Sequence, residues 1–252
     1  MGEPLMYKEF PAILDICVRH GVKLNLTTNG SFYGRGVAAW SELILPVASD
    51  IKLSWNAASK DLQESIMKGS NFSKQVENLR LLVAKRDEYA NAGGNRATIT
   101  LQLTFMECNL NEIPKVVQLA IDMGVDRVKG HHLWAHFGEI KEQSLRRDDN
   151  AMQRWNKVAQ ECRELITNHN VDAQHKADKS MLTLDNFHDL EPGTQEIKSD
   201  ATCPFLGQEA WINHKGRFDP CCAPDDQRLA LGHFGMSSPR VEITSAHPQH
   251  PQ

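Results

Sequence analysis

Polar residues recur at the points where the chain leaves a predicted strand. Thr27-Thr28-Asn29-Gly30 follows the first such strand, Ser54 ends the second, and Gln102 and Thr104 lie late in the third. Gly2-Glu3-Pro4 precedes the first predicted helix, where a further strand would end. In a parallel α/β sheet the carboxyl ends of the strands meet at one edge, and ligands bind there. Each group alone is also consistent with a turn or a strand cap, but their recurrence favours a shared binding site.

Three cysteines near the end of the sequence form a second group with possible chemistry. Cys203 precedes Lys215-Gly216, and Cys221 and Cys222 follow it. The Lys-Gly pair suits the turn of a β-hairpin, which would bring the two cysteine positions together. Thiolates grouped in this way hold iron–sulfur clusters or zinc, and unliganded thiols are the remaining alternative. A zinc site would need a histidine as well, and the two candidates are His214 and His233.

Composition excludes several classes of protein. The chain has 252 residues, of which 40% are hydrophobic and 24% charged, as in an ordinary globular protein. The net charge of -4 gives no electrostatic case for binding nucleic acid. No apolar run approaches the roughly 20 residues that span a bilayer, and the first residues do not resemble a signal peptide. Cytoplasmic localisation is expected, with buried free thiols at the other cysteines, which are Cys17, Cys108 and Cys162.

Hydrophobic periodicity predicts an alternation of helices and strands. The helices are expected around residues 7–20, 40–47, 72–83, 113–120 and 155–166. The strands are expected at residues 22–27, 50–54, 97–105 and 127–133. Short returns that pass through glycine, at Gly21 and Gly124, favour four parallel strands side by side in that order, with helices on the outer face. The pattern alone does not separate a barrel from an open doubly wound sheet.

The periodicity also predicts the division of the chain. Residues 1–185 are expected to form the α/β body, and residues 186–202 a linker. Residues 203–240 would form a small cysteine-containing segment. The last residues, 241–252, contain two prolines and no periodicity, so we expect them to be disordered.

The order of these motifs resembles the radical SAM superfamily. Gly-Glu-Pro, helix, strand, Thr-Asn-Gly, helix and a strand ending in Ser follow one another over residues 2–135. Residues 109–114, Asn-Leu-Asn-Glu-Ile-Pro, resemble the loop before that family's fifth helix. The segment from Cys203 to Phe234 resembles the opening of a SPASM or twitch extension. The resemblance implies an α/β fold, a partial (β/α) barrel without its first strand, with a small cysteine-containing extension.

The resemblance also implies a set of cofactor ligands. The residues that would bind S-adenosylmethionine are Gly2, Glu3, Pro4, Thr28, Asn29, Ser54 and Leu133. The Gly-Glu-Pro segment would meet the amino group, and Asn29 would lie near the cofactor or brace its site. Ser54 would face the ribose or carboxylate, and the backbone at Leu133 would flank the adenine. An auxiliary cluster would be held by the cysteines Cys203, Cys221 and Cys222. No catalytic residue is assigned.

The sequence departs from that family at its start. Met1 stands where a glycine normally precedes Gly-Glu-Pro, and no Cys-x3-Cys-x2-Cys occurs in the chain. The motifs therefore predict a protein truncated at both ends and inactive by itself. The intact parent would use S-adenosylmethionine, a [4Fe–4S] cluster and an electron donor for radical chemistry, with a peptide or protein as the expected substrate class.

Two other functions stay open at this point. The chain is consistent with a non-catalytic remnant that still binds a ligand or partner. It is also consistent with an unrelated α/β-barrel lyase, which would need a lysine or paired carboxylates at strand ends. The nearby candidates for that chemistry are Lys129 and Asp126.

Overall fold

The chain divides into two compact units, Met1–Pro192 and Gly193–Gln252, each described here by itself. The structure is a computed structural model. It describes residues 2–135, 138–175, 181–192, 211–212, 217–219 and 232–233.

The smaller unit contains a short antiparallel sheet. Its strands, in sheet order, are β6 (Trp211–Ile212), β7 (Arg217–Asp219) and β8 (Gly232–His233). Trp211 pairs with Asp219 and Ile212 with Phe218. This pairing confirms the hairpin predicted around Lys215-Gly216. Cys203, Cys221, Cys222 and the predicted tail 241–252 lie outside the described residues.

The larger unit is built on a parallel sheet whose strand order is the sequence order. Its strands are β1 (Leu24–Thr28), β2 (Ala48–Ser54), β3 (Thr98–Phe105), β4 (Arg127–His132) and β5 (Thr183–Asp185). The prediction of four parallel strands side by side is confirmed. The fifth strand was not predicted, because three residues are too few to show an alternating pattern.

The helices of this unit lie before β1 or connect successive strands. They are α1 (Phe10–His20), α2 (Gly36–Ile44), α3 (Lys60–Ile66), α4 (Phe72–Asn91), α5 (Ile113–Met123) and α6 (Asp149–His175), with 3-10 helices η1 (Pro4–Met6), η2 (Glu107–Glu112) and η3 (Gly138–Gln143). Gly21 (φ 63°) and Gly124 (φ 70°) end α1 and α5 in the left-handed conformation, as the sequence predicted. Among the described residues, no helix is both long and apolar enough to cross a bilayer.

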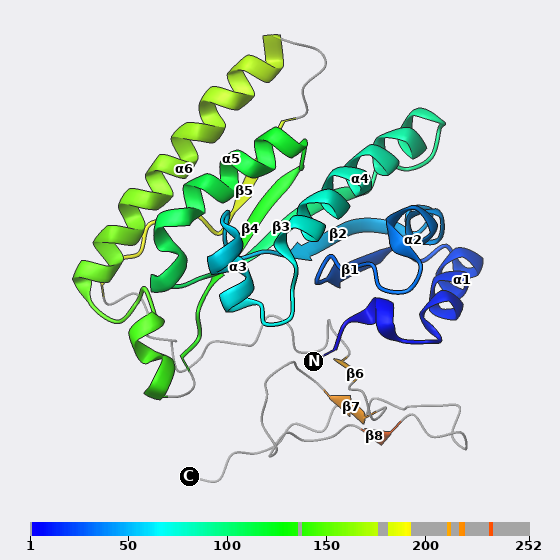
Figure 1. Cartoon of the computed structure of the whole chain (residues 1–252), viewed down its shortest axis with the longest axis horizontal. Helices are drawn as coiled ribbons and strands as arrows, with labels where there is room; N and C mark the ends of the chain where they lie inside the picture. The colour runs from blue at the N-terminus through cyan, green and yellow to red at the C-terminus, as the bar shows by residue number, and fades with distance from the viewer. Residues whose placement is uncertain are drawn as a thin grey trace, which may run out of the picture. The chain divides into compact units, whose positions relative to one another are not determined.

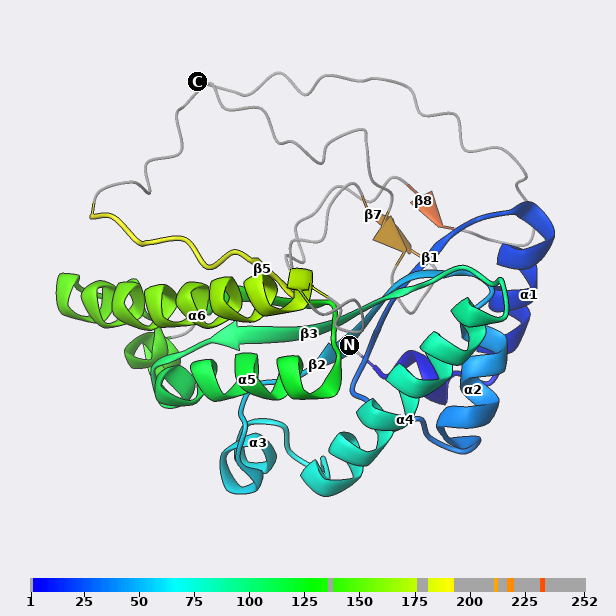
Figure 2. The same cartoon turned by 90° about the horizontal axis from the view of Figure 1, so that it is seen from above.

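All the long helices lie on one face of the sheet. Crossovers between parallel neighbouring strands are right-handed, so a strand order without reversals places every crossover helix on the same side. Contacts run from α1 to α2, α2 to α4, α4 to α5 and α5 to α6. Figure 1 shows this row of helices from α6 on the left to α1 on the right, and Figure 2 shows the sheet from above.

Side chains on the strands alternate between an apolar and a polar face. Those directed to the helices are almost fully buried, as at Ile51, Leu53, Ile99, Leu101 and Val128. The alternate positions of β2, β3 and β4 are polar or charged and form what we call the polar face: Asp50, Lys52, Ser54, Thr98, Thr100, Gln102, Thr104, Arg127, Lys129 and His131. Parallel strands covered on both faces are usually hydrophobic throughout, so only the helix face serves as core.

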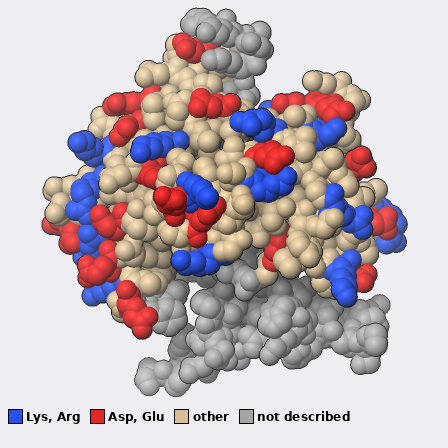
Figure 3. All heavy atoms as spheres, viewed as in Figure 1, with Lys and Arg blue, Asp and Glu red and all other residues tan. Residues whose placement is uncertain are grey.

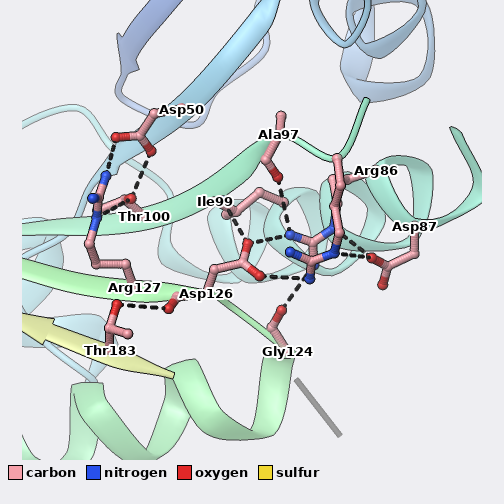
Figure 4. Close-up of polar contacts among 11 residues, drawn as sticks. Asp50, Arg86, Asp87, Ala97, Ile99, Thr100, Gly124, Asp126, Arg127 and Thr183 are labelled. Carbon is pink, nitrogen blue, oxygen red and sulfur yellow. Dashed lines mark hydrogen bonds and ion pairs between the residues drawn. The ribbon is translucent and has the colours of Figure 1, made fainter. Parts of the chain in front are cut away.

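A buried ion-pair cluster joins α4 to the first residues of β3 and β4 (Figure 4). Arg86 is 1% exposed and donates to the carboxylate of Asp126 and to the carbonyl of Gly124, at 3.1 Å. The same Asp126 carboxylate accepts a hydrogen bond from the Ile99 amide at 2.8 Å and pairs with Arg96 at 2.6 Å. Asp126 therefore has a structural role at the amino ends of the strands, far from the edge where a lyase would need it.

The body extends further along the chain than residues 1–185. The compact unit ends at Pro192, and Phe187 and Leu190 are 3% and 7% exposed within its core. The first residues of the predicted linker 186–202 therefore belong to the body, because their apolar side chains are buried there. Residues 193–202 lie outside the described residues.

β1 is an edge strand among the described residues, and the segment before it exposes several apolar side chains. In the described part of the chain, β1 pairs only with β2. Large apolar side chains are exposed close by in sequence, at Met6, Tyr7, Ile13, Ile16, Val18 and Val22. An edge strand leaves backbone groups open for pairing with further polypeptide.

We predict that Asp126→Ala lowers the free energy of unfolding by about 3–5 kcal/mol, because it leaves the buried Arg86 charge without its main partner. Denaturant-induced unfolding measures the change. Asp15→Ala is the matched control, because Asp15 pairs with Arg19 on the surface of α1, and its loss should cost less than about 1 kcal/mol. Equal losses in the two variants would contradict the role assigned to the cluster.

Candidate functional site

The predicted site residues converge at the carboxyl edge of the sheet. β1 and β2 end side by side, since Thr28 pairs with Leu53, and Ser54 pairs with Gln102 of β3. On the next strand, the Leu133 amide donates to the Phe105 carbonyl at 3.1 Å just beyond β4. The polar residues that follow successive strands therefore share one edge, as their recurrence in the sequence predicted.

The Glu3 carboxylate fastens the start of the chain to the end of β1. One oxygen accepts hydrogen bonds from the Thr28 hydroxyl at 2.7 Å and the Leu5 amide at 3.2 Å. The other oxygen accepts one from the Asn29 amide at 2.7 Å. Gly2-Glu3-Pro4 is thereby placed against the Thr-Thr-Asn-Gly loop. An ionised carboxylate has about four acceptor positions, so one remains for a ligand.

Thr28 and Asn29 differ in what they can offer a ligand. Thr28 is 1% exposed, and its hydroxyl donates to Glu3 and accepts from the Gly30 amide at 3.2 Å. Its role is to position the loop. The Asn29 side-chain oxygen accepts a hydrogen bond from the Ser31 backbone amide at 2.8 Å. The Asn29 side-chain nitrogen donates to no residue in the described part of the chain. Asn29 therefore keeps a free donor.

Three amide side chains hold the loops after β1 and β2. Gln63 accepts from the amides of Asn56 and Ala57 at 2.8 and 2.9 Å and donates to Gln75 at 3.2 Å. Gln75 in turn donates to the Asn29 carbonyl at 2.8 Å. The third member, Asn78, donates at 2.8 Å to the carbonyl of Gly30. The three amides are 0%, 3% and 4% exposed. This set was not predicted, because glutamine and asparagine on a helix ordinarily indicate its solvent side.

Position 30 requires a glycine because of both its backbone conformation and the space around its Cα atom. Its φ is 76°, in the left-handed region that side chains rarely adopt. An added Cβ would lie 3.3 Å from a methyl group of Leu53 and 4.0 Å from the side chain of Gln75. The glycine therefore lets the loop after β1 turn directly over the core and reach the amides of α4.

The loop after β3 is fixed by Asn109 and Glu112. Asn109 is fully buried and donates at 2.9 Å to the carbonyls of both Asn56 and Thr104, which joins the ends of β2 and β3. The Glu112 carboxylate accepts from the amides of Ala58 and Ser59 at 2.9 Å and from the Ser59 hydroxyl at 2.6 Å. Burial would raise the pKa of Glu112, but these hydrogen bonds outweigh burial and lower it. The residues that carry the family-like motif here are structural.

Three neutral side chains of the polar face are left with hydrogen-bonding capacity. Ser54, Gln102 and Thr104 are partly exposed, and their side chains form no hydrogen bond with the described residues. Ser54 and Gln102 lie directly opposite each other on neighbouring strands. Hydroxyl and amide groups of this kind suit the ribose, carboxylate and amino groups of a nucleoside-like cofactor.

The two histidines that end β4 face opposite sides of the sheet. His132 packs among aromatic rings, with centroids 5.2 Å from Phe105 and 4.7 Å from Trp155. Burial, with help from the positive charge of Arg146, lowers the pKa of His132 to about 4, so the ring is neutral at physiological pH. His131 is exposed on the polar face. Gly130, on β4, packs directly against the Phe105 ring. A Cβ atom at this position would clash with that ring.

The cysteines of the described residues offer no cluster. Cys17 and Cys162 are buried, Cys108 is exposed, and burial raises the pKa of Cys162 to about 12. Across the part of the chain that the structure describes, no three His, Cys, Asp or Glu side chains are grouped to hold a metal ion. These residues do not fit a [4Fe–4S] cluster, which needs grouped thiolates. The sequence-predicted ligands Cys203, Cys221 and Cys222 lie outside the described residues.

The helix side of the molecule carries charges of both signs. Figure 3 shows lysine and arginine side chains interspersed with aspartate and glutamate over the helices. A surface with interspersed charges of both signs is ordinary for a globular protein. The face in view therefore has no large region of one electrostatic sign.

Comparison with known proteins finds a likeness in structure only. No family model matches the sequence, and the search of curated proteins finds no match. Among solved structures, the chain is similar to SuiB of Streptococcus suis bound to S-adenosylmethionine, with a TM-score of 0.59 and 16% identity over 91% of this chain and 50% of SuiB. Another structure of SuiB gives 0.58 and 15%, over 91% and 51%.

More distant structures also match. A domain of a pyruvate-formate lyase-activating enzyme from Bacteroides vulgatus gives a TM-score of 0.48 and 12% identity, over 73% of this chain and 94% of that domain. The chain spans about half the length of SuiB, to which it is more similar. The chain has an α/β fold similar to that of SuiB, in line with the partial barrel that its motifs predicted.

Proposed function

We propose that the chain binds S-adenosylmethionine at the carboxyl edge of its sheet and is part of a radical SAM enzyme. The observation that carries this proposal is the position of Gly2-Glu3-Pro4, held against the end of β1 by the Glu3 carboxylate. The similarity of fold to a protein solved with S-adenosylmethionine supports it.

The unfilled groups at this edge match the parts of the cofactor. The remaining acceptor position of Glu3 suits the cofactor's ammonium group. The free hydroxyl of Ser54 suits its ribose or carboxylate, and the side-chain nitrogen of Asn29 supplies a donor close to Glu3. The backbone at Leu133, three strands from β1, would flank the adenine. Thr28 would act through Glu3 and Gly30 without touching the cofactor.

We propose that the radical chemistry belongs to a longer parent protein. A [4Fe–4S] cluster, when bound, supplies the electron that cleaves S-adenosylmethionine, and an external donor reduces that cluster. The described cysteines do not group to hold it, so no step through a cluster is assigned to these residues. The β6–β7 hairpin supports the prediction of an auxiliary cluster at Cys203, Cys221 and Cys222. A peptide or protein remains the proposed class of substrate.

The two alternatives make different demands on these residues. A non-catalytic remnant would still bind the cofactor at the carboxyl edge of the sheet. Only a measurement of turnover distinguishes it from an active enzyme. A lyase that uses Lys129 with Asp126 loses support, because Asp126 is committed to Arg86 and Arg96 at the opposite ends of the strands.

We predict that the 252-residue chain binds S-adenosylmethionine and that Ser54→Ala weakens binding roughly threefold to tenfold, the loss expected for one hydrogen bond. Isothermal titration calorimetry measures both dissociation constants. Ser49→Ala is the matched control, because Ser49 lies on the same strand and bonds to Asn25 on the exposed edge. The proposal fails if the wild-type chain shows no binding, or if the two variants weaken it equally.

We predict no 5′-deoxyadenosine from this chain after anaerobic iron–sulfur reconstitution and reduction with dithionite. The sequence contains no Cys-x3-Cys-x2-Cys, and the described cysteines belong to no group of side chains that could hold a metal ion. Chromatography of the reaction mixture checks the result. Production of 5′-deoxyadenosine in amounts that scale with this chain would show that it is active by itself.

A further inference from the structure

The Lys52 ammonium lies on the polar face and donates no hydrogen bond to any residue that the structure describes. Its side chain is 22% exposed, and its single ion pair is with Asp50, whose nearer oxygen is 3.6 Å away. That distance is beyond a hydrogen bond. Asp50 is already occupied, because it accepts from the Thr100 hydroxyl at 2.8 Å and from Arg127 (Figure 4). Within the described residues, Lys52 is therefore a half-buried cation without a hydrogen-bond acceptor.

Lys129 supplies a second ammonium on the same face. It pairs with Asp185 at 3.2 Å, and the two side chains are 28% and 41% exposed. In the strand register it lies beside Gln102, whose amide forms no hydrogen bond with the described residues. Burial, followed by the charge of Lys129, lowers the pKa of His131, with Lys52 acting in the same direction and Asp185 opposing. Both lysines therefore act on the same small region.

The charges of this region do not cancel. Three cations, Lys52, Arg127 and Lys129, face two carboxylates, Asp50 and Asp185. His131 contributes no charge near neutral pH, because its pKa is lowered. The three cations therefore exceed the two carboxylates by one positive charge. The Lys52 and Lys129 ammonium groups also keep hydrogen-bond donors that no described residue accepts. A singly charged anion would complete the arrangement without displacing Asp50.

We propose that Lys52, Lys129 and Gln102 bind a carboxylate group of the substrate. The inference rests on the proposed function, because the polar face lies directly before the edge assigned to S-adenosylmethionine. Gln102 and Lys129 lie in register with Ser54, and Lys52 precedes Ser54 on β2, so this carboxylate site borders the cofactor edge on the polar face.

The carboxylate of S-adenosylmethionine is a second source of the same chemistry, and distance separates the two. Its ammonium and carboxylate groups are attached to the same carbon, and we place the ammonium at Glu3, beside β1. Lys129 is on β4, three strands away, or about 14 Å across the sheet. A cofactor carboxylate held near β1 therefore lies out of reach of Lys129, and on this inference Ser54 faces the ribose and not the carboxylate.

The probe for this site is N-acetylglutamic acid α-amide, with its neutral counterpart N-acetylglutamine α-amide. NMR titration of the full chain follows the backbone amides of Leu53, Gly130 and His131. We expect saturable shifts with the acid only. Lys129→Gln should weaken binding roughly tenfold or more, the loss of a charge-assisted hydrogen bond. Lys129→Arg should recover most of the affinity, because it keeps the charge.

Lys85→Gln is the matched control, because Lys85 pairs with Glu88 on the solvent side of α4. It should leave binding unchanged, and all variants should keep the wild-type unfolding midpoint. Saturating S-adenosylmethionine should not displace the acid. Equal binding of the two probes, no loss in Lys129→Gln, displacement by S-adenosylmethionine, or tighter binding of inorganic phosphate would each overturn the inference. Failure of S-adenosylmethionine to bind at all would overturn the proposed function and leave the result for Lys129 standing.

Discussion

The structure depends on one constraint, which is that all crossover helices cover a single face of a parallel sheet. Strand order follows sequence order, so right-handed crossovers place the helices together and give the apolar side chains of every strand one common core. The opposite face has no helical layer from these crossovers. It carries polar side chains in register across the strands, such as Ser54, Gln102, Lys129 and Asp185. Binding capacity is therefore a consequence of the topology.

Buried polar groups have different roles at the two ends of the strands. At the amino ends, Arg86 and Asp126 join α4 to β3 and β4 and leave nothing for a ligand. At the carboxyl ends, Gln63 and Gln75 form hydrogen bonds that fix the loops, while Glu3, Ser54 and Asn29 keep capacity for a ligand. In a preorganised site, ligand-binding groups with free hydrogen-bonding capacity are held in place by buried polar groups whose hydrogen bonds are all made within the protein.

The sequence predicted the frame of the fold and part of the site. Periodicity and the glycines at Gly21 and Gly124 gave four strands in the correct order, and the recurrence of polar residues gave their common edge. Short elements such as β5 and α3 carry too few residues for a period to show. Long-range hydrogen bonds also have no local pattern. Gln63 and Gln75 look like surface residues, and Asp126 looks like a candidate acid until Arg86 is placed beside it.

The central claim is that S-adenosylmethionine binds at the carboxyl edge of the sheet, and hydrogen–deuterium exchange tests it most directly. The exchange of backbone amides is compared with and without saturating cofactor. The account predicts slower exchange at residues 29–31, 54–57 and 133, where Glu3 and the buried amides hold the loops, and unchanged exchange along α6. Unchanged exchange at all three loops, or slowing confined to other parts of the chain, would contradict the claim.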